Sequence, residues 1–139
     1  MIVCDTGALV AAADRDEEHN RACTDLFTGL HLAARPILVP VPVVAEVGYL
    51  LSRAAGAQVE AGFLRSIVSG TFTVVDLQTS DSDRMADLVE TYADFPLGTT
   101  DAAVIAVAER LGVREIATVD HRHFRAVRPR HAEAFALLP

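Results

Sequence analysis

The sequence predicts a three-layer α/β fold in which helices cover both faces of a mainly parallel central sheet. Three observations support this fold class. Short apolar segments rich in β-branched residues recur along the chain, for example Ile2–Cys4 and Ile37–Val41. Helical segments separate them, and strands joined through helices pair in parallel by crossover connections. An aspartate directly follows two such segments, at Asp5 and Asp120, at the edge where open parallel sheets bind ligands.

The N-terminal part predicts one strand and two helices. Ile2–Cys4 is apolar throughout, as in a central strand buried on both faces. After Asp5, Ala8–Ala13 predicts one or two helical turns. Glu17–Leu30 then predicts an amphipathic helix. Its apolar face would comprise Ala22, Leu26, Phe27 and Leu30.

The second strand is predicted at Ile37–Val41, and Pro42 suits a helix start. Helices are expected over Val43–Ala55 and Ala57–Val68, with Gly56 between them. The residues expected to pack inward from the first helix are Val44, Val47, Leu50 and Leu51, and the apolar residues of the second are Phe63, Leu64 and Ile67. They exceed what one buried face needs, so part of them could bind an amphipathic helix of a partner protein or a second copy of the chain.

The third strand is predicted at Thr71–Leu77 because this segment is β-rich. Ser80 or Asp81 can cap a helix that runs to about Phe95. Its inward residues would be Met85, Leu88, Val89 and Tyr92. Pro96 and Gly98 separate this helix from the next.

The next helix is apolar at nearly every position from Ala102 to Leu111, which predicts burial on most of its circumference. Thr99 or Thr100 can cap it, leaving Asp101 in the first turn, and Gly112 ends it. Ile116–Val119 predicts the fourth strand, a loop follows Asp120, and Ala134–Leu138 predicts a last edge strand.

Length and composition fit one domain over residues 1–139, long enough to bury about two-thirds of its unfolded surface. No stretch is long and apolar enough to predict a transmembrane span, and Met1–Asp5 has no basic leader. Only Cys4 and Cys23 are present, in a predicted strand and a predicted helix, so we expect free thiols in a reducing cytoplasm. The net charge of −7, from 12 basic and 19 acidic residues, disfavours non-specific binding of nucleic acid.

Four acids are predicted at the carboxyl edge of the sheet. Asp5 and Asp120 follow strands, while Glu46 and Asp101 lie near the starts of helices. Each has an ordinary alternative as a turn, capping or solvated helix residue. Two carboxylates about 4 Å apart repel by about 4 kcal/mol at a surface-like dielectric, so four together need a cation. Oxygen ligands favour Mg²⁺ or Mn²⁺ over zinc, and such a site suits in-line phosphoryl displacement.

The acids lie within four short motifs: Ile2-Val3-Cys4-Asp5-Thr6, Val44-Ala45-Glu46-Val47, Thr100-Asp101-Ala102-Ala103, and Thr118-Val119-Asp120 with Phe124 shortly after. Their order and spacing over essentially the full length resemble the PIN-domain ribonucleases, specifically the VapC-type toxins of toxin–antitoxin pairs. Gly7 and Val47 depart mildly from the pattern, because Ser or Asn and Leu are commoner there.

The resemblance implies cleavage of RNA by an endonuclease that depends on Mg²⁺ or Mn²⁺, a homodimer, and a cognate antitoxin that blocks the active site. It gives metal-binding and catalytic roles to Asp5, Glu46, Asp101 and Asp120, with Asp5 and Asp101 as the core metal ligands. It gives supporting positions to Thr6 and Thr118.

The segment after Asp120 carries four arginines, Arg122, Arg125, Arg128 and Arg130. They fit a phosphate-positioning surface or a contact for an acidic antitoxin, and an ordinary solvated loop is the alternative. His121 and His123 could suggest zinc, but no further ligand stands at a useful spacing, which favours loop residues.

Three other functions fit parts of the sequence. An aspartic protease also places Asp-Thr-Gly after an apolar strand, but such proteases are β proteins, and several helices are predicted here. A phosphatase with an aspartate nucleophile usually needs a second acid two residues on, where this chain has Gly7. A PIN-like module that binds RNA or protein without cutting is the main alternative. It would not need to gather four charges that repel one another.

Overall fold

A computed structural model describes the whole chain, Met1–Pro139, and contains one parallel five-stranded sheet. The strands are β1 (Ile2–Cys4), β2 (Ile37–Pro40), β3 (Thr73–Val75), β4 (Glu115–Ala117) and β5 (Ala136–Leu138). Their order in the sheet is β3-β2-β1-β4-β5, and every neighbouring pair is parallel. The predicted α/β class with a parallel sheet is confirmed.

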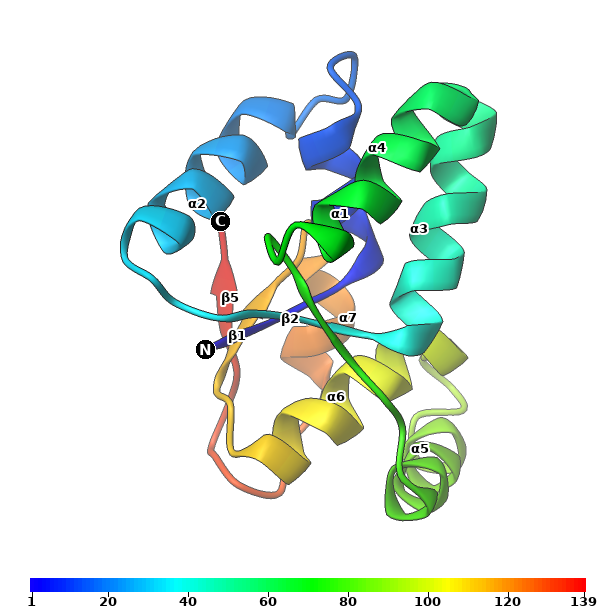
Figure 1. Cartoon of the computed structure of the whole chain (residues 1–139). Helices are drawn as coiled ribbons and strands as arrows, with labels where there is room; N and C mark the ends of the chain where they lie inside the picture. Colours follow the sequence, from blue (N-terminus) through cyan, green and yellow to red (C-terminus); the bar gives the residue numbers. More distant parts are fainter.

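Helices form a layer on each face of this sheet (Figure 1). The first four are α1 (Thr6–Ala13), α2 (Asn20–Leu32), α3 (Val41–Ala54) and α4 (Ala57–Val68), and the others are α5 (Thr79–Thr91), α6 (Thr99–Leu111) and α7 (His121–Ala126). The connections through α1–α4 run from β1 towards β3, whereas those through α5–α7 run from β3 back to β5. Right-handed crossovers that travel in opposite directions lie on opposite faces, which explains the two layers. None of the helices combines the length and apolar character that crossing a lipid bilayer requires.

The core is built around β1 and α6. All three residues of β1 are fully buried, as expected of a strand covered on both faces. Seven consecutive residues of α6, Ala102–Ala108, are buried, which confirms the prediction from its nearly continuous apolar sequence. Gly112 ends α6 in the left-handed conformation (φ 67°), where an L side chain would be strained. Helix α6 therefore holds its first residues in a fixed place beside β1.

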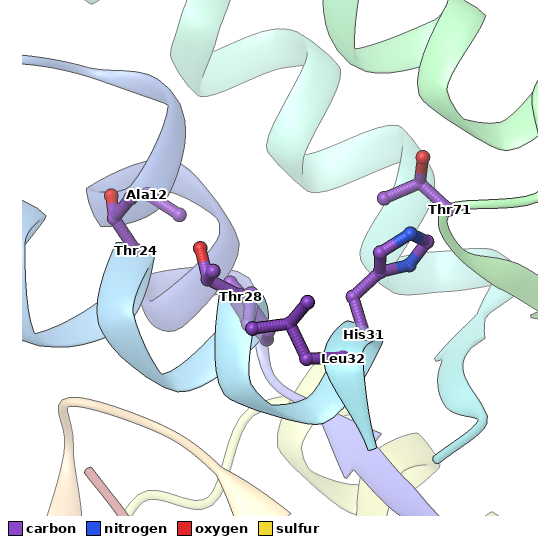
Figure 2. A pocket seen from close by; sticks show the side chains of 7 residues that line it. Ala12, Thr24, Thr28, His31, Leu32 and Thr71 are labelled. Atoms are coloured by element: carbon purple, nitrogen blue, oxygen red, sulfur yellow. The ribbon is translucent and has the colours of Figure 1, made fainter. Parts of the chain in front are cut away.

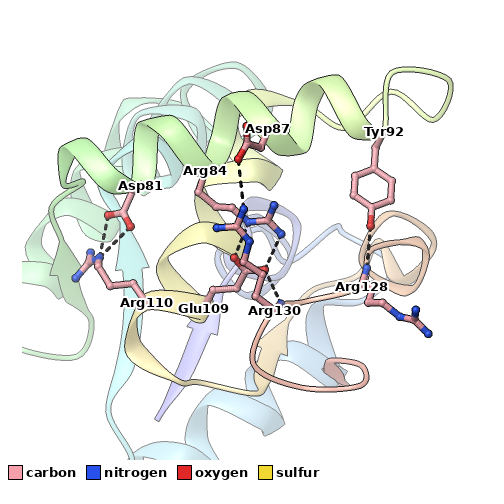
Figure 3. Close-up of polar contacts among 8 residues, drawn as sticks. All are labelled: Asp81, Arg84, Asp87, Tyr92, Glu109, Arg110, Arg128 and Arg130. Atoms are coloured by element: carbon pink, nitrogen blue, oxygen red, sulfur yellow. Dashed lines mark hydrogen bonds and ion pairs between the residues drawn. The ribbon is translucent and has the colours of Figure 1, made fainter.

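Ion pairs join α5 to α6 (Figure 3). The Arg84 guanidinium donates to both carboxylate oxygens of Glu109, with distances of 2.7 and 2.9 Å, and both side chains are largely buried. Arg110 donates to Asp81 over 2.9 Å, and Asp81 is only 2% exposed. Because both pairs are shielded from water, they fix the position of α5 on α6.

Some predicted boundaries were wrong by a few residues. Helix α2 begins at Asn20 instead of Glu17, and α5 ends at Thr91 instead of near Phe95. Strand β3 covers Thr73–Val75, since it pairs only with the short β2. The segment after Asp120 is not wholly a loop, because α7 begins there. The predicted last strand is present as β5, paired in parallel with β4.

Several apolar side chains predicted to point inward are exposed. They are Ala22, Leu50 and Val89, whereas Cys23 occupies the inward position on α2. An amphipathic helix buries only one stripe, so apolar residues beyond that stripe stay outside. Cys4 and Cys23 are buried free thiols, as predicted.

Candidate active site

Asp5 lies at the end of β1 and caps α1. Its Oδ1 accepts a hydrogen bond from the Thr6 backbone N–H (2.7 Å), and its Oδ2 accepts one from the Thr118 hydroxyl (2.8 Å). The residue is only 5% exposed. Burial raises the pKa of Asp5 to about 6, opposed by the hydrogen bond from Thr118, and the nearby charges of Asp101 and Glu46 raise it further. Asp5 is therefore an acid held close to other acids.

Glu46 lies on α3, and Thr6 connects it to Asp5 by hydrogen bonds to both side chains. Its Oε2 accepts a hydrogen bond from the Thr6 hydroxyl (2.7 Å), while the backbone N–H of Thr6 serves Asp5. The side chain of Glu46 reaches the surface. Thr6 thus sets the positions of two carboxylates at once.

Asp101 lies in the first turn of α6, where its Oδ2 accepts from the backbone N–H of Gly98 (3.1 Å). The N-cap is Gly98, and the predicted cap at Thr99 or Thr100 was wrong. Burial raises the pKa of the Asp101 carboxyl, and the charges of Asp120 and Glu46 add to this. The Gly98 N–H and the nearby His123 act in the opposite direction.

Asp120 follows β4 and caps α7. Its Oδ1 accepts from the His123 backbone N–H (3.4 Å), and its Oδ2 lies 2.5 Å from Nδ1 of the His123 ring. The Asp120 backbone N–H donates to the Thr118 hydroxyl (3.0 Å), which itself donates to Asp5. Thr118 is fully buried, and it links the ends of β1 and β4.

The four acids therefore come from four elements and converge at the carboxyl edge of the sheet. Each of Asp5 and Asp101 is influenced by the charge of at least two others. No arginine forms an ion pair with any of them, although five arginines pair with acids elsewhere. The His123 ring pairs with Asp120, and the other three carboxylates have no basic partner.

The donor set fits a hard divalent cation. The available atoms are carboxylate oxygens, which Mg²⁺ and Mn²⁺ prefer. No three His, Cys, Asp or Glu side chains lie close enough together to enclose a metal ion by themselves. This agrees with the way Mg²⁺ usually binds, through one or two carboxylates with water and substrate phosphate completing its shell. Asp5 and Asp101 are the two most buried acids of the group.

Sequence reasoning missed His123, which contacts this site. The sequence favours a loop residue at this position, but α7 turns the His123 ring onto Asp120. The signal was available, since Asp120 is a good N-cap and no Gly or Pro interrupts His121–Ala126. A residue three positions after an N-cap lies on the same side of the helix.

The ring of Phe95 also lies next to α7, from the loop between α5 and α6. His123 meets it edge-on with ring centroids 5.2 Å apart, and the Arg122 guanidinium lies over it at 5.1 Å. No feature of the sequence alone connects Phe95 with residues 27 and 28 positions later. The pairing arises because α6 brings its own N-terminus back to the end of β4.

The four arginines after Asp120 do not share one environment. Arg122 lies on Phe95, and Arg125 is exposed. The backbone N–H of Arg128 donates to the Tyr92 hydroxyl (2.9 Å). Arg130 pairs with Asp87 over 3.3 Å, and its backbone N–H donates to Glu109, within the α5–α6 ion pairs of Figure 3. Arg130 has a structural partner, whereas Arg122 has no acidic one.

Close packing against Val119 explains why position 7 is a glycine. A Cβ on Gly7 would lie 2.7 Å from the Val119 side chain, closer than real Cβ atoms approach. The first turn of α1 is therefore packed directly against the segment that leads from Thr118 to Asp120. A Ser or Asn at this position would require Val119 to move.

The larger pockets of the surface lie away from these acids. One of about 330 Å³ lies beside α2 and is lined by Thr24, Thr28, His31, Leu32 and neighbouring residues (Figure 2). It contains no carboxylate, and most of its lining residues are exposed. It shares no residue with the acidic edge.

Known proteins resemble this chain over nearly its whole length. The PIN domain family matches residues 2–129. The chain is 31% identical over 138 residues to "Ribonuclease VapC26" of Mycobacterium tuberculosis, covering 99% of this chain and 100% of that protein.

Solved structures share the fold. The crystal structure of VapC20 of Mycobacterium tuberculosis, described as a "Sarcin-Ricin loop cleaving toxin", superposes with a TM-score of 0.80 at 16% identity, covering 96% of this chain and 99% of that one. A chain of VapBC2 from Rickettsia felis, bound to a DNA fragment from its promoter, gives a TM-score of 0.72 at 15% identity with full coverage of both chains. A chain of FitAcB from Neisseria gonorrhoeae gives 0.69 at 16% identity, covering 100% of this chain and 97% of that one.

Proposed function

Because this chain belongs to the PIN domain family, we propose that it is a metal-dependent endoribonuclease and the toxin of a toxin–antitoxin pair. Residues 1–139 act as a single nuclease domain. The substrate is RNA, the cofactor is Mg²⁺ or Mn²⁺, and the protein works in the cytoplasm, where its RNA is found. The relative named as a ribonuclease, matched along its whole length, supports the activity.

The observation that carries this proposal is the uncompensated group of acids at the carboxyl edge of the sheet. A domain gains no stability from Asp5, Glu46, Asp101 and Asp120 at one place, since their charges repel. The repulsion is useful only when a cation and a phosphate bind there. A bound divalent cation would supply positive charge against the phosphate oxygens.

Each residue of the site has its own role in the proposed reaction. Asp5 and Asp101 hold the cation, because they are the most buried and therefore the most strongly relieved by it. Thr6 and Thr118 fix Asp5 through hydrogen bonds to its two oxygens. Glu46 uses only one carboxylate oxygen on Thr6, and its other oxygen can accept a proton from the attacking water. Asp120 holds α7 and its His123 against the acids.

A cleavage assay tests the activity directly. The purified chain, free of antitoxin, is incubated with single-stranded and structured RNA in Mg²⁺, in Mn²⁺ and in EDTA. We expect internal cuts with either metal and none in EDTA. A chain that binds these RNAs but cuts none of them under any of the three conditions would instead be the PIN-like binding module.

The pKa of Asp5 predicts how metal binding depends on pH. Its value of about 6 lies well above the value of about 3.9 for an unfolded chain. Below pH 6 a proton therefore competes with the cation for Asp5. We expect Mg²⁺ to raise the melting temperature (Tm) fully at pH 7.5, and this gain to shrink as pH falls through 6. Equal gains at pH 5 and pH 7.5 would contradict Asp5 as a ligand.

The same pKa predicts the behaviour without metal. An acid whose pKa is raised by folding stabilises the fold below its unfolded pKa and loses that contribution as pH rises through its folded pKa. At pH 7.5 in EDTA, Asp5→Asn should raise the free energy of unfolding by about 1–2 kcal/mol, or roughly 3–8 °C in Tm. It should respond little to Mg²⁺. A lower Tm than wild type in EDTA together with a full response to Mg²⁺ would make Asp5 a structural turn residue.

The partner surface is expected on α3 and α4, which lie side by side (Figure 1). Their exposed apolar residues include Tyr49, Leu50, Leu64 and Val68, and we call these four residues the α3–α4 surface. An amphipathic helix of an antitoxin would bury its apolar face there, and a second copy of the chain could use the same residues. Phe63 is not part of this surface, because it is buried and packs against Phe72.

Leu64→Asp should therefore release the antitoxin or dissociate the homodimer while Tm changes little. The measurement is the mass of the particle by light scattering, with and without a cognate antitoxin. Val89→Asp is the matched control, because Val89 is an equally exposed apolar residue on the opposite layer. If both assemblies survive Leu64→Asp with the fold intact, the α3–α4 surface binds neither partner.

A further inference from the structure

We propose that Arg122, Phe95 and His123 form a stacking subsite for one RNA base beside the acidic edge. This rests on the proposed ribonuclease function and adds the feature of the substrate that the site recognises. The three residues come from two segments, the α5–α6 loop and α7.

The arrangement is built in layers. The guanidinium of Arg122 lies over the ring of Phe95 at 5.1 Å, and the ring of His123 supports Phe95 edge-on at 5.2 Å. His123 is in turn held by Asp120, 2.5 Å from its Nδ1. Arg122 therefore rests on Phe95, Phe95 on His123, and His123 on Asp120, which is one of the four acids. The outer layer is Arg122, whose side chain is exposed.

The charges favour RNA at this place. Arg122 has no carboxylate partner, although the chain carries an excess of acids. A guanidinium resting on an aromatic ring presents a second flat face, on which a nucleobase can stack, and edge N–H groups for a phosphate. A free cation next to uncompensated carboxylates also lowers the repulsion that an approaching RNA backbone would meet.

The neighbouring arginines do not offer the same surface. Arg130 is engaged with Asp87 and Glu109, and Arg128 is anchored through its backbone to Tyr92. Arg125 contacts no aromatic ring, whereas Arg122 does. The subsite thus offers a stacking face for one base, on Arg122. This face lies beside the acids that would hold the neighbouring phosphate.

The experiment measures kcat/KM for cleavage of a single-stranded RNA of twelve nucleotides, and of copies that each lack one base. In wild type, removing the base next to the cut should lower kcat/KM roughly five- to a hundredfold, the scale of one base stacked on a protein. Arg122→Lys keeps the charge and loses the flat face, and Phe95→Leu keeps the apolar volume and loses the ring. Both variants should cut the intact RNA more slowly by a similar factor and should no longer respond to loss of that base.

A matched control lies on α3, where Arg53 rests over the ring of Tyr49 at 5.6 Å, away from α7. Arg53→Lys should leave the base-loss response unchanged. The dissociation constant for the same RNA, measured by anisotropy in Ca²⁺, gives a second readout and should weaken in Arg122→Lys and Phe95→Leu only.

Equal sensitivity to base loss in wild type and in both variants would overturn the subsite while leaving the nuclease in place. Weaker binding of antitoxin by Arg122→Lys, with unchanged RNA cleavage, would also overturn it, since the surface would then serve the partner. If wild type cuts no RNA at all, the proposed function fails first and the subsite fails with it.

Discussion

Asp5→Asn is expected to lower RNA cleavage by at least about a hundredfold, the scale of losing a central electrostatic group of an active site. The substitution keeps the shape of the side chain, and its amide oxygen can still accept the hydrogen bond from Thr6. It removes one negative charge from the acid most affected by burial and by its neighbours. Asp101→Asn should have a similar effect, because Asp101 is likewise desolvated beside other acids.

A control variant should remove an aspartate that also follows a strand but lies outside the active site. Asp76 directly follows β3, as Asp5 directly follows β1, but its side chain is exposed and makes no ion pair. Asp76→Asn should therefore cut RNA as fast as wild type. Initial rates at saturating Mg²⁺, with a melting curve for each variant, complete the measurement. Undiminished activity of Asp5→Asn or Asp101→Asn would remove the acid group from the chemistry.

The sequence predicts the acidic edge because topology and burial both leave local marks. β1 and β2 are short apolar runs, and α6 is apolar on all sides, so each had to lie in the interior. Once these strands are parallel, the residues after them share one edge. The convergence of Asp5 and Asp120 needed no knowledge of side-chain contacts.

Side-chain placement on the helix surfaces could not be predicted in the same way. Leu50 and Leu64 look like core residues by type, yet both are more than a third exposed. An apolar side chain left outside costs little, so composition does not decide which of several candidates is buried. Ala22 and Cys23 are adjacent, and only the position of α2 against α1 decides that Cys23 turns inward.

Contacts between distant segments could not be predicted from the sequence for a different reason. The pairing of Arg84 with Glu109 spans 25 positions, and that of Phe95 with His123 joins a loop to a helix. Neither has a spacing that local periodicity could detect. α7 could have been detected, since Asp120 has the chemistry of a cap, but a helix of six residues leaves too short a pattern.

Glu109→Ala is expected to lower the free energy of unfolding by about 2–4 kcal/mol, or roughly 6–15 °C in Tm. Glu109 accepts two hydrogen bonds from Arg84 and one from the backbone of Arg130, and its side chain is only 8% exposed. Its removal leaves the guanidinium of Arg84 without a partner in a place that water reaches poorly. An unpaired, nearly buried charge accounts for most of the cost.

The loss of stability in Glu109→Ala should depend on pH. Burial alone would raise the pKa of Glu109, but hydrogen bonds from Arg84 and Arg130 and their charges together lower it below its ordinary value. An acid with a lowered pKa stabilises the fold above its unfolded pKa, about 4.3, and loses that contribution as pH falls through its folded pKa. The difference between wild type and Glu109→Ala should thus be largest at neutral pH and should narrow in acid.

Two further variants decide whether the buried pair is the cause. Asp87→Ala breaks the Arg130–Asp87 pair, whose side chains are both more than half exposed, and should cost at most about 1 kcal/mol. Replacing both partners, Arg84→Met with Glu109→Leu, removes the charges together and should recover much of the lost stability. If Glu109→Ala melts within two degrees of wild type, or if the double variant is no more stable than Glu109→Ala, the Arg84–Glu109 pair contributes little to holding α5 on α6. Because α6 carries Asp101, the same melts also report how firmly the acidic edge is supported.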